Sequence, residues 1–233
     1  MDRRQFTGAL PALLGGSSLL LAACDNGRSD YDAAAAATWR IGTVPPSEPT
    51  AIAAELVRYA TLAPSSHNTQ CWKFKLEAGA VTILPDLTRR CPAVDPDDHH
   101  LFVSLGCAAE NLVVAAAALG LRAEASFDAA SEGIRIGLEP ALPAASAQFQ
   151  AIARRQSTRA DYDGRPLSPL ELAQLERAGT TPGVGLLLLT DRPRMEQVLE
   201  YVVQGNTAQM ADPAFVDELK RWIRFSGRDA VRL

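Results

Sequence analysis

The sequence predicts an α+β fold without the regular strand–helix–strand alternation of a doubly wound sheet. Two pairs of short alternating segments favour two hairpins, and longer segments with helical spacing separate and follow them. The 233 residues are 47% hydrophobic and 21% charged, which suffices for a substantial core in one domain or two small ones. The net charge of −4 argues against nucleic acid as the main partner, since phosphate-binding surfaces usually carry a basic excess.

Residues 1–24 have the pattern of an export signal. The paired Arg3 and Arg4 precede a phenylalanine in a positive segment that resembles a twin-arginine signal. The apolar stretch 9–23 is shorter than the roughly 20 residues of a membrane span. It ends in the letters LAAC, which resemble a bacterial lipobox and predict lipidation of Cys24. A buried N-terminal helix with a chance cysteine is the alternative interpretation.

This signal predicts a periplasmic or cell-envelope lipoprotein, exported by the twin-arginine route and held at the membrane through Cys24. Residues 25–47 contain an alanine run and are interpreted as a tether between the anchor and the folded part. Such export carries folded proteins, often with a cofactor inside, and therefore favours a bound cofactor.

The four cysteines form no CxxC pair, so zinc-ribbon and thioredoxin-like motifs are unsupported and no metal site is expected. With Cys24 lipidated, Cys71, Cys91 and Cys107 remain in an oxidising compartment. At most one disulfide can then form, and one thiol stays free.

The body of the chain begins with a helix expected over 47–62, whose apolar residues keep a helical spacing and whose N-cap is Ser47. A polar loop at 65–70 follows a proline. Residues 72–76 alternate between apolar and charged side chains, and with 81–84 they predict a hairpin that turns at an Ala-Gly pair.

A long apolar helix is expected at about 97–119, with the acidic residues of 95–98 at its start, where they suit the helix dipole. Its alanine-rich end indicates close packing. Residues 121–127 and 134–138 alternate again and predict a second hairpin. The segment 140–146 is the best internal boundary.

Beyond that boundary the pattern predicts a short helix leading into 154–159 and a second helix at 168–178. A strand is expected at 184–190. Two further helices are expected near 192–210 and 213–225.

The polar loop is the first cluster that could carry chemistry. It offers two serine hydroxyls, an imidazole and two amides, which could bind a polar heteroaromatic ring or its sugar-like chain. These groups belong to Ser65, Ser66, His67, Asn68 and Gln70. The alternative is a capped turn whose side chains satisfy their own backbone.

The second cluster is Arg155, Ser157 and Arg159. Arginines spaced by four around a hydroxyl can grip a phosphate, because the guanidinium fork matches phosphate oxygens bidentately. The alternative is a solvated helix end with cations near its C-terminus.

Together the two clusters resemble the nitroreductase superfamily. The letters APSSHNTQ, followed by Trp72 and Phe74, are similar to that superfamily's flavin-contacting loop APSS-x-N-x-QPW-x-F. R-x-S-x-R with Tyr162 shortly after is similar to its other FMN motif. The loop comes first here, which is typical of the Acg-type FMN-binding oxidoreductases, where two nitroreductase-like halves are fused. Residues 105–112 also resemble that group.

The resemblance implies a nitroreductase-like fold of tandem fused halves, 48–145 and 146–233, with FMN held between them. In the loop, Ser65, Ser66, Asn68 and Gln70 would contact the flavin ring and ribityl chain. Arg155 and Ser157 would hold the ribityl–phosphate end, and Arg159 would lie near the pyrimidine edge. No catalytic side-chain acid or base is expected, because hydride enters and leaves at the flavin.

Two departures from the family pattern bear on this expectation. Cys71 replaces the proline that usually precedes the tryptophan, which restores a backbone N–H. The chain stops at Leu233, whereas relatives continue for on the order of a hundred residues, a typical domain-sized addition. We therefore expect an incomplete, C-terminally truncated second half, an open apolar face on 48–145 and self-association.

Three functions follow as alternatives. The first is an FMN-dependent oxidoreductase that passes hydride from NAD(P)H to a nitro, quinone or similar small acceptor. The second is a lipoprotein that binds or sequesters flavin without turnover. The third is an inactive truncated remnant.

Overall fold

The computed structural model describes residues 27–42, 48–158 and 160–232. The chain divides into two compact units. The larger unit is Thr38–Ile223, and it holds the sheet and all the candidate binding residues that the structure describes. The export signal, Cys24, Ser47 and Arg159 lie outside the described residues. The prediction that Ser47 is the N-cap of the first core helix is wrong, because that helix begins at Pro49 and its N-cap is Glu48.

The smaller unit contains α1 (Arg28–Thr38), whose last residue belongs to the larger unit, and α8 (Gly227–Val231). Helix α1 occupies part of the segment interpreted as a tether, and none of its residues is buried. Helix α8 begins at Ser226, whose side-chain oxygen accepts a hydrogen bond from the Asp229 N–H at 3.1 Å.

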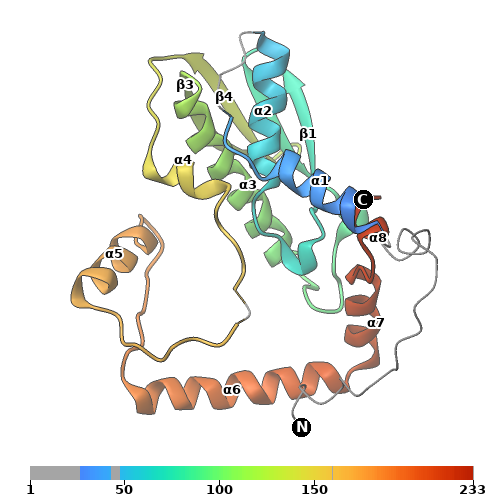
Figure 1. Ribbon diagram of the computed structural model, residues 1–233, viewed down its shortest axis with the longest axis vertical. Helices are drawn as coiled ribbons and strands as arrows, with labels where there is room; N and C mark the ends of the chain where they lie inside the picture. Colours follow the sequence, from blue (N-terminus) through green and yellow to red (C-terminus); the bar gives the residue numbers. More distant parts are fainter. Residues whose placement is uncertain (1–26, 43–47, 159, 233) are drawn as a thin grey trace, which may run out of the picture. The chain divides into compact units, whose positions relative to one another are not determined.

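Four antiparallel strands form one open sheet with the order β1-β2-β4-β3. The strands are β1 (Trp72–Glu77), β2 (Ala80–Pro85), β3 (Leu121–Asp128) and β4 (Gly133–Pro140). Both hairpins lie where the alternation predicts them (Figure 1). The first turns at Gly79, whose φ of 70° is a conformation that glycine adopts without a Cβ clash.

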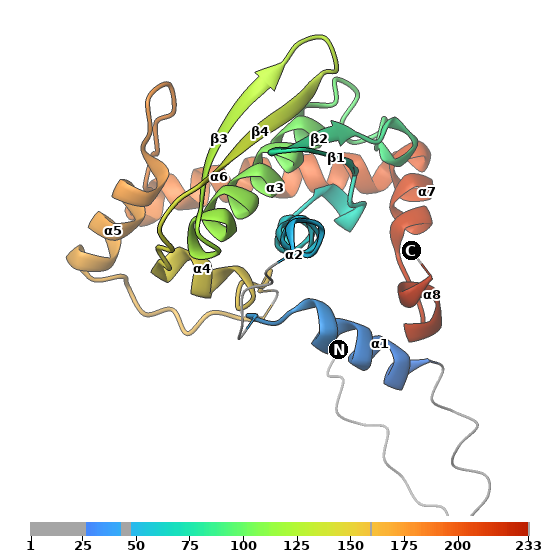
Figure 2. The ribbon, with the colours of Figure 1, turned by 90° about the horizontal axis from the view of Figure 1, so that it is seen from above.

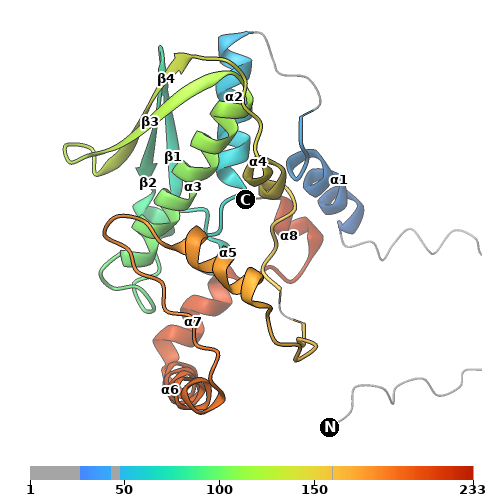
Figure 3. The ribbon, with the colours of Figure 1, turned by 90° about the vertical axis from the view of Figure 1, so that its left-hand side faces the viewer.

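The helices α2 (Pro49–Thr61), α3 (His99–Ala118) and α4 (Ala147–Ile152) complete the core. Helix α3 lies along one face of the sheet with α2 packed beside it (Figures 2 and 3). Its buried residues recur every three or four positions, as a helix with one core-facing stripe requires. They are Leu101, Ser104, Leu105, Ala108, Ala109, Leu112, Ala115 and Ala116.

Helix α3 is also long and apolar enough to cross a membrane by length and composition. Because its buried stripe packs on the sheet, α2 and α4, it is explained as the core helix of the larger unit. This confirms the buried helix that the sequence predicts at about 97–119.

Three helices follow: α5 (Pro169–Gly179), α6 (Arg192–Ala211) and α7 (Pro213–Trp222). The prediction of a strand at 184–190 is wrong. This segment contributes only one isolated bridge, between Thr181 and Val184, because it meets no partner strand among the described residues. A short apolar run forms an extended strand only where a second strand can satisfy its backbone.

Candidate functional site

The polar loop connects the end of α2 to the start of β1. Leu62 closes α2, and a single 3₁₀ turn, η2 (Ser66–Asn68), follows. The Asn68 N–H donates to the Ser65 carbonyl and the Thr69 N–H to the Ser66 carbonyl, both at 3.0 Å. These bonds fold the loop tightly between two regular elements.

The backbone of this loop lies largely in the left-handed region. His67, Asn68 and Gln70 have φ angles of 48°, 55° and 51°. Asparagine tolerates this region, whereas histidine and glutamine pay a steric penalty there. Such backbone strain concentrates at binding and active sites, where it fixes the direction of side chains.

The side chains of the loop divide into two groups. The Ser65 hydroxyl accepts a hydrogen bond from the Gln70 N–H at 2.9 Å, as the capped-turn interpretation expects. Within the described part of the chain, no hydrogen bond engages the side chains of Ser66, Asn68 or Gln70. Asn68 and Gln70 are exposed, so their amides are available to a ligand.

The end of the loop is anchored in the core. Thr69 is buried, and its carbonyl accepts a hydrogen bond from Arg89 Nη1 at 2.7 Å. The next residue, Cys71, is also buried, with its Sγ 3.9 Å from the Leu101 carbonyl. Burial raises the pKa of the Cys71 thiol, so this thiol stays protonated and unreactive at neutral pH.

The second cluster is positioned by α4. The Ser146 hydroxyl caps this helix by accepting from the Phe149 N–H at 3.1 Å. The buried Phe149 ring lies 5.1 Å from the ring of Tyr59 on α2. Because α4 is thereby fixed against α2, the residues that follow it lie close to the end of α2.

Arg155 meets the start of the polar loop. Its Nη2 donates a hydrogen bond to the Leu62 carbonyl at 3.2 Å, although the two residues are 93 positions apart. Its guanidinium lies over the Trp39 ring, 5.7 Å from the ring centroid. Leu62 is three residues before Ser65, so Arg155 adjoins the loop. Ser157 is exposed, and Tyr162 is 84% exposed.

Two supporting residues were not singled out from the sequence. The buried Asp95 accepts hydrogen bonds from the N–H groups of His100 and Leu101, both at 3.0 Å, and so caps α3. The Asn111 side chain donates to the Tyr59 carbonyl at 3.2 Å and ties α3 to α2. The acidic run before α3 indicated a helix start, but composition alone could not distinguish the capping residue among three aspartates.

Comparison with known proteins adds a family relationship. No protein-family model matches the chain. Two curated proteins of Mycobacterium tuberculosis, named "Putative NAD(P)H nitroreductase MT3217" and "Putative NAD(P)H nitroreductase Rv3131", are each 32% identical to it over 177 residues. Each match covers 72% of this chain and 49% of the relative, so the chain spans about half the length of these relatives.

The mixed α and β architecture with an open antiparallel sheet is compatible with a nitroreductase-like fold. The homology agrees with the motifs from which the resemblance was drawn. It therefore supports a relationship between this chain and the nitroreductase superfamily, over about half of the relatives' length.

Proposed function

We propose that this protein is an FMN-dependent oxidoreductase of the Acg type, which uses NAD(P)H to reduce a nitro, quinone or similar small compound. The homologues, named as NAD(P)H nitroreductases, suggest NAD(P)H-dependent oxidoreductase activity. Nitroreductases generally use flavin cofactors, which supports FMN. The chain's own residues supply the argument for where FMN binds.

The observation that carries the proposal is the hydrogen bond from Arg155 to the Leu62 carbonyl. It brings the arginine segment to the polar loop across 93 positions of sequence. A flavin mononucleotide needs polar groups for its ring and a cation for its phosphate, and these two segments offer them side by side.

The free polar side chains of the loop fit this ligand. In the proposed arrangement Ser66, Asn68 and Gln70 bind the flavin ring and ribityl chain, together with the Ser65 hydroxyl, which keeps its own proton to donate. Arg155 and Ser157 hold the phosphate end, and Arg159 lies near the pyrimidine edge. When bound, FMN supplies the hydride chemistry, and the protein supplies binding, orientation and positive charge.

The proposal extends to the organisation of the whole protein. In it, residues 48–145 and 146–233 belong to two nitroreductase-like halves. We further propose that the protein self-associates through its exposed apolar surface. Sedimentation of the purified 233-residue chain tests this, and a strictly monomeric chain would contradict it.

Flavin titration of the purified chain tests the binding site. We expect Arg155→Ala and Asn68→Ala each to weaken FMN binding, with a loss of roughly ten- to a hundredfold for the arginine, which contacts a phosphate. Arg177→Ala, an exposed arginine on α5, is the matched control and should leave the dissociation constant unchanged. Unchanged binding in both site variants would place the flavin elsewhere.

Turnover separates the proposed enzyme from the two alternatives. A chain that purifies yellow binds flavin and is not an inert remnant. Bleaching of the flavin by NAD(P)H, followed by reoxidation with a nitroaromatic compound, distinguishes the oxidoreductase from a protein that only sequesters flavin. A yellow colour that persists when either NADH or NADPH is added would favour a protein that only sequesters flavin.

We also propose that Cys24 carries a lipid that anchors the protein in the cell envelope. Cys24→Ser should then release the protein from the membrane fraction, because a lipid anchor dominates the membrane affinity of an acidic protein. Cys107→Ser, which changes a thiol far from the signal in sequence, should leave the partitioning as it is. Equal partitioning of both variants would refute the anchor.

A further inference from the structure

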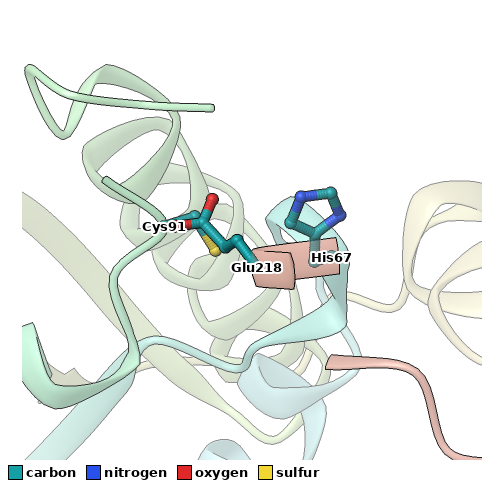
Figure 4. Close-up of side chains that lie close together, drawn as sticks. All are labelled: His67, Cys91 and Glu218. Carbon is teal, nitrogen blue, oxygen red and sulfur yellow. The ribbon is translucent and has the colours of Figure 1, made fainter. Parts of the chain in front are cut away.

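Three side chains with metal-binding atoms converge beneath the polar loop. His67 comes from the loop, Cys91 from the segment after η3 (Leu87–Arg89), and Glu218 from α7. Figure 4 shows the Glu218 carboxylate over the sulfur of Cys91, with the His67 ring beside them. One ligand atom from each residue lies within 4.8 Å of the other two.

The Glu218 carboxylate is held in a fixed orientation by the backbone. It accepts hydrogen bonds from the Ala93 N–H at 3.0 Å and the Val94 N–H at 3.2 Å, one at each oxygen. The side chain is buried, with a 4% exposed fraction for the residue. A carboxylate has about four lone-pair sites, so about two remain for another partner. Hydrogen-bonded carboxylates of this kind are common among metal ligands.

The other two residues also lack a complete set of partners. His67 Nε2 is buried and, among the described residues, has no hydrogen-bond partner. The His67 ring packs edge-on against Phe215 of α7, with 6.3 Å between ring centroids, which limits its rotation. Cys91 is buried and is not in a disulfide. A buried imidazole nitrogen without a partner is costly, and a metal ion would remove that cost.

We propose that His67, Cys91 and Glu218 bind a divalent transition-metal ion of the Zn²⁺ class. One thiolate, one imidazole and one carboxylate suit Zn²⁺, and three protein ligands leave a fourth position for water. On binding, the Cys91 thiol releases its proton to solvent, and the resulting thiolate and the Glu218 carboxylate balance the charge of the ion. Ligand bonds of about 2.0–2.3 Å place tetrahedral ligand atoms roughly 3.3–3.7 Å apart, so the side chains need to close by about 1 Å.

Two further charged groups act on this centre. Asp95 adds negative charge near Cys91, and Arg221, one turn along α7 from Glu218, adds positive charge. The competing explanation of the cluster is that the arginine alone balances the carboxylate. A bound metal ion would also be coordinated by Cys91 and by His67 Nε2, which the arginine leaves without a role.

Bound metal would clamp α7 against the polar loop through three segments that are distant in sequence. It is a structural role that does not rest on the proposed flavin chemistry, so flavin-free protein can be used to test it. The sequence predicts no metal site, because the three ligands come from separate segments and form no spaced motif.

The first experiment uses the purified 233-residue chain, freed of metal and flavin and titrated with Zn²⁺ or Co²⁺. We expect one equivalent to bind. Cobalt should give the thiolate charge-transfer band in the near ultraviolet and the intense visible bands of a tetrahedral ion. Absence of the thiolate band, with no stoichiometric zinc binding, would overturn the proposal and leave Arg221 as the balancing charge.

The second experiment assigns the ligands. Cys91→Ser and Glu218→Gln should each weaken zinc binding by at least about tenfold. The matched controls are Cys107→Ser on α3 and Glu200→Gln, an exposed residue of α6, which should bind zinc as the wild type does. Circular dichroism verifies that each variant is folded. This ligand set would be refuted if a control variant weakened zinc binding as much as the site variants do, or if neither site variant weakened it.

Discussion

Two regions of the larger unit contrast in how they bury apolar side chains. The body, residues 48–158, encloses one core between α2, α3, α4 and the sheet. The arm, residues 160–211, contains α5 and α6, and none of its described residues is buried. Tertiary packing therefore stabilises the helices of the body, whereas α5 and α6 depend on helix propensity and capping.

The exposed apolar side chains concentrate in the arm. Leu170, Leu187 and Tyr201 have exposed fractions of 64%, 76% and 75%. The sequence led us to expect the open apolar face on residues 48–145, and there the structure has an apolar groove lined by α2, the β1–β2 hairpin and residues of β3 and β4. Extended apolar surface is uncommon in monomers and favours association. The arm is thus the stronger candidate for a surface that needs a partner.

The largest expected effect is a cavity in the core of the body. Leu105 on α3 is fully buried, so Leu105→Ala removes apolar contacts and leaves a cavity. We expect a loss of about 2–5 kcal/mol in the free energy of unfolding, measured by urea denaturation. A loss below about 1 kcal/mol would mean that the body is no better packed than the arm.

The next effect comes from the cap of α3. Asp95→Ala removes the acceptor of two backbone N–H groups, of which that of Leu101 is buried, and should cost about 1–3 kcal/mol in the free energy of unfolding. Asp97→Ala, an exposed neighbour in the same acidic run, is the control and should change little. Equal effects would show that charge near the helix end, rather than capping, is what matters.

A smaller effect is expected in how the free energy of unfolding depends on pH, which should differ between the body and the arm. Hydrogen bonds of 2.6 and 2.8 Å from Arg58 lower the pKa of Glu55 below its ordinary value of 4.5. The stabilisation is present above the unfolded pKa and is lost as pH falls through the lower folded pKa. Between about pH 6 and pH 3, the free energy of unfolding should therefore fall less in Glu55→Gln than in the wild type.

Glu171 of the arm provides the comparison for this measurement. The N–H and hydroxyl of Ser168, the N-cap of α5, lower its pKa as well, but this carboxylate is exposed to solvent. Glu171→Gln should change the pH dependence of unfolding less than Glu55→Gln does. A larger change for Glu171 would reverse the order of the two regions.

The smallest expected effect is a truncation in the arm. Leu199 on α6 is 57% exposed, so Leu199→Ala should change the free energy of unfolding by no more than about 0.5 kcal/mol. If the arm lies in an interface between copies, the same variant should weaken self-association in sedimentation. Strong destabilisation of dilute, monomeric protein would show that this helix is packed after all.

The elements of the body could be predicted because each buries one face, which gives its sequence a period of two or about 3.6. Residues 184–190 form a short, mostly apolar run rather than an alternating one, and no strand forms there, since a strand also requires a partner. The polar loop was visible as a contiguous motif. Two contacts of the candidate sites could not be predicted: the hydrogen bond from Arg155 to Leu62 and the approach of Glu218 to Cys91. Contacts across 93 or more positions leave no periodic pattern in the sequence.

In the left-handed turn of the polar loop, the residue that would be best for stability differs from the residue that would be best for binding. Glycine at 67 or 70 would relieve a steric penalty of roughly 1–2 kcal/mol per residue, but it would carry no side chain. Selection for thermal stability alone would therefore favour glycine at both positions. An imidazole and an amide stand there instead, a pattern typical of sites where activity is kept at the expense of stability.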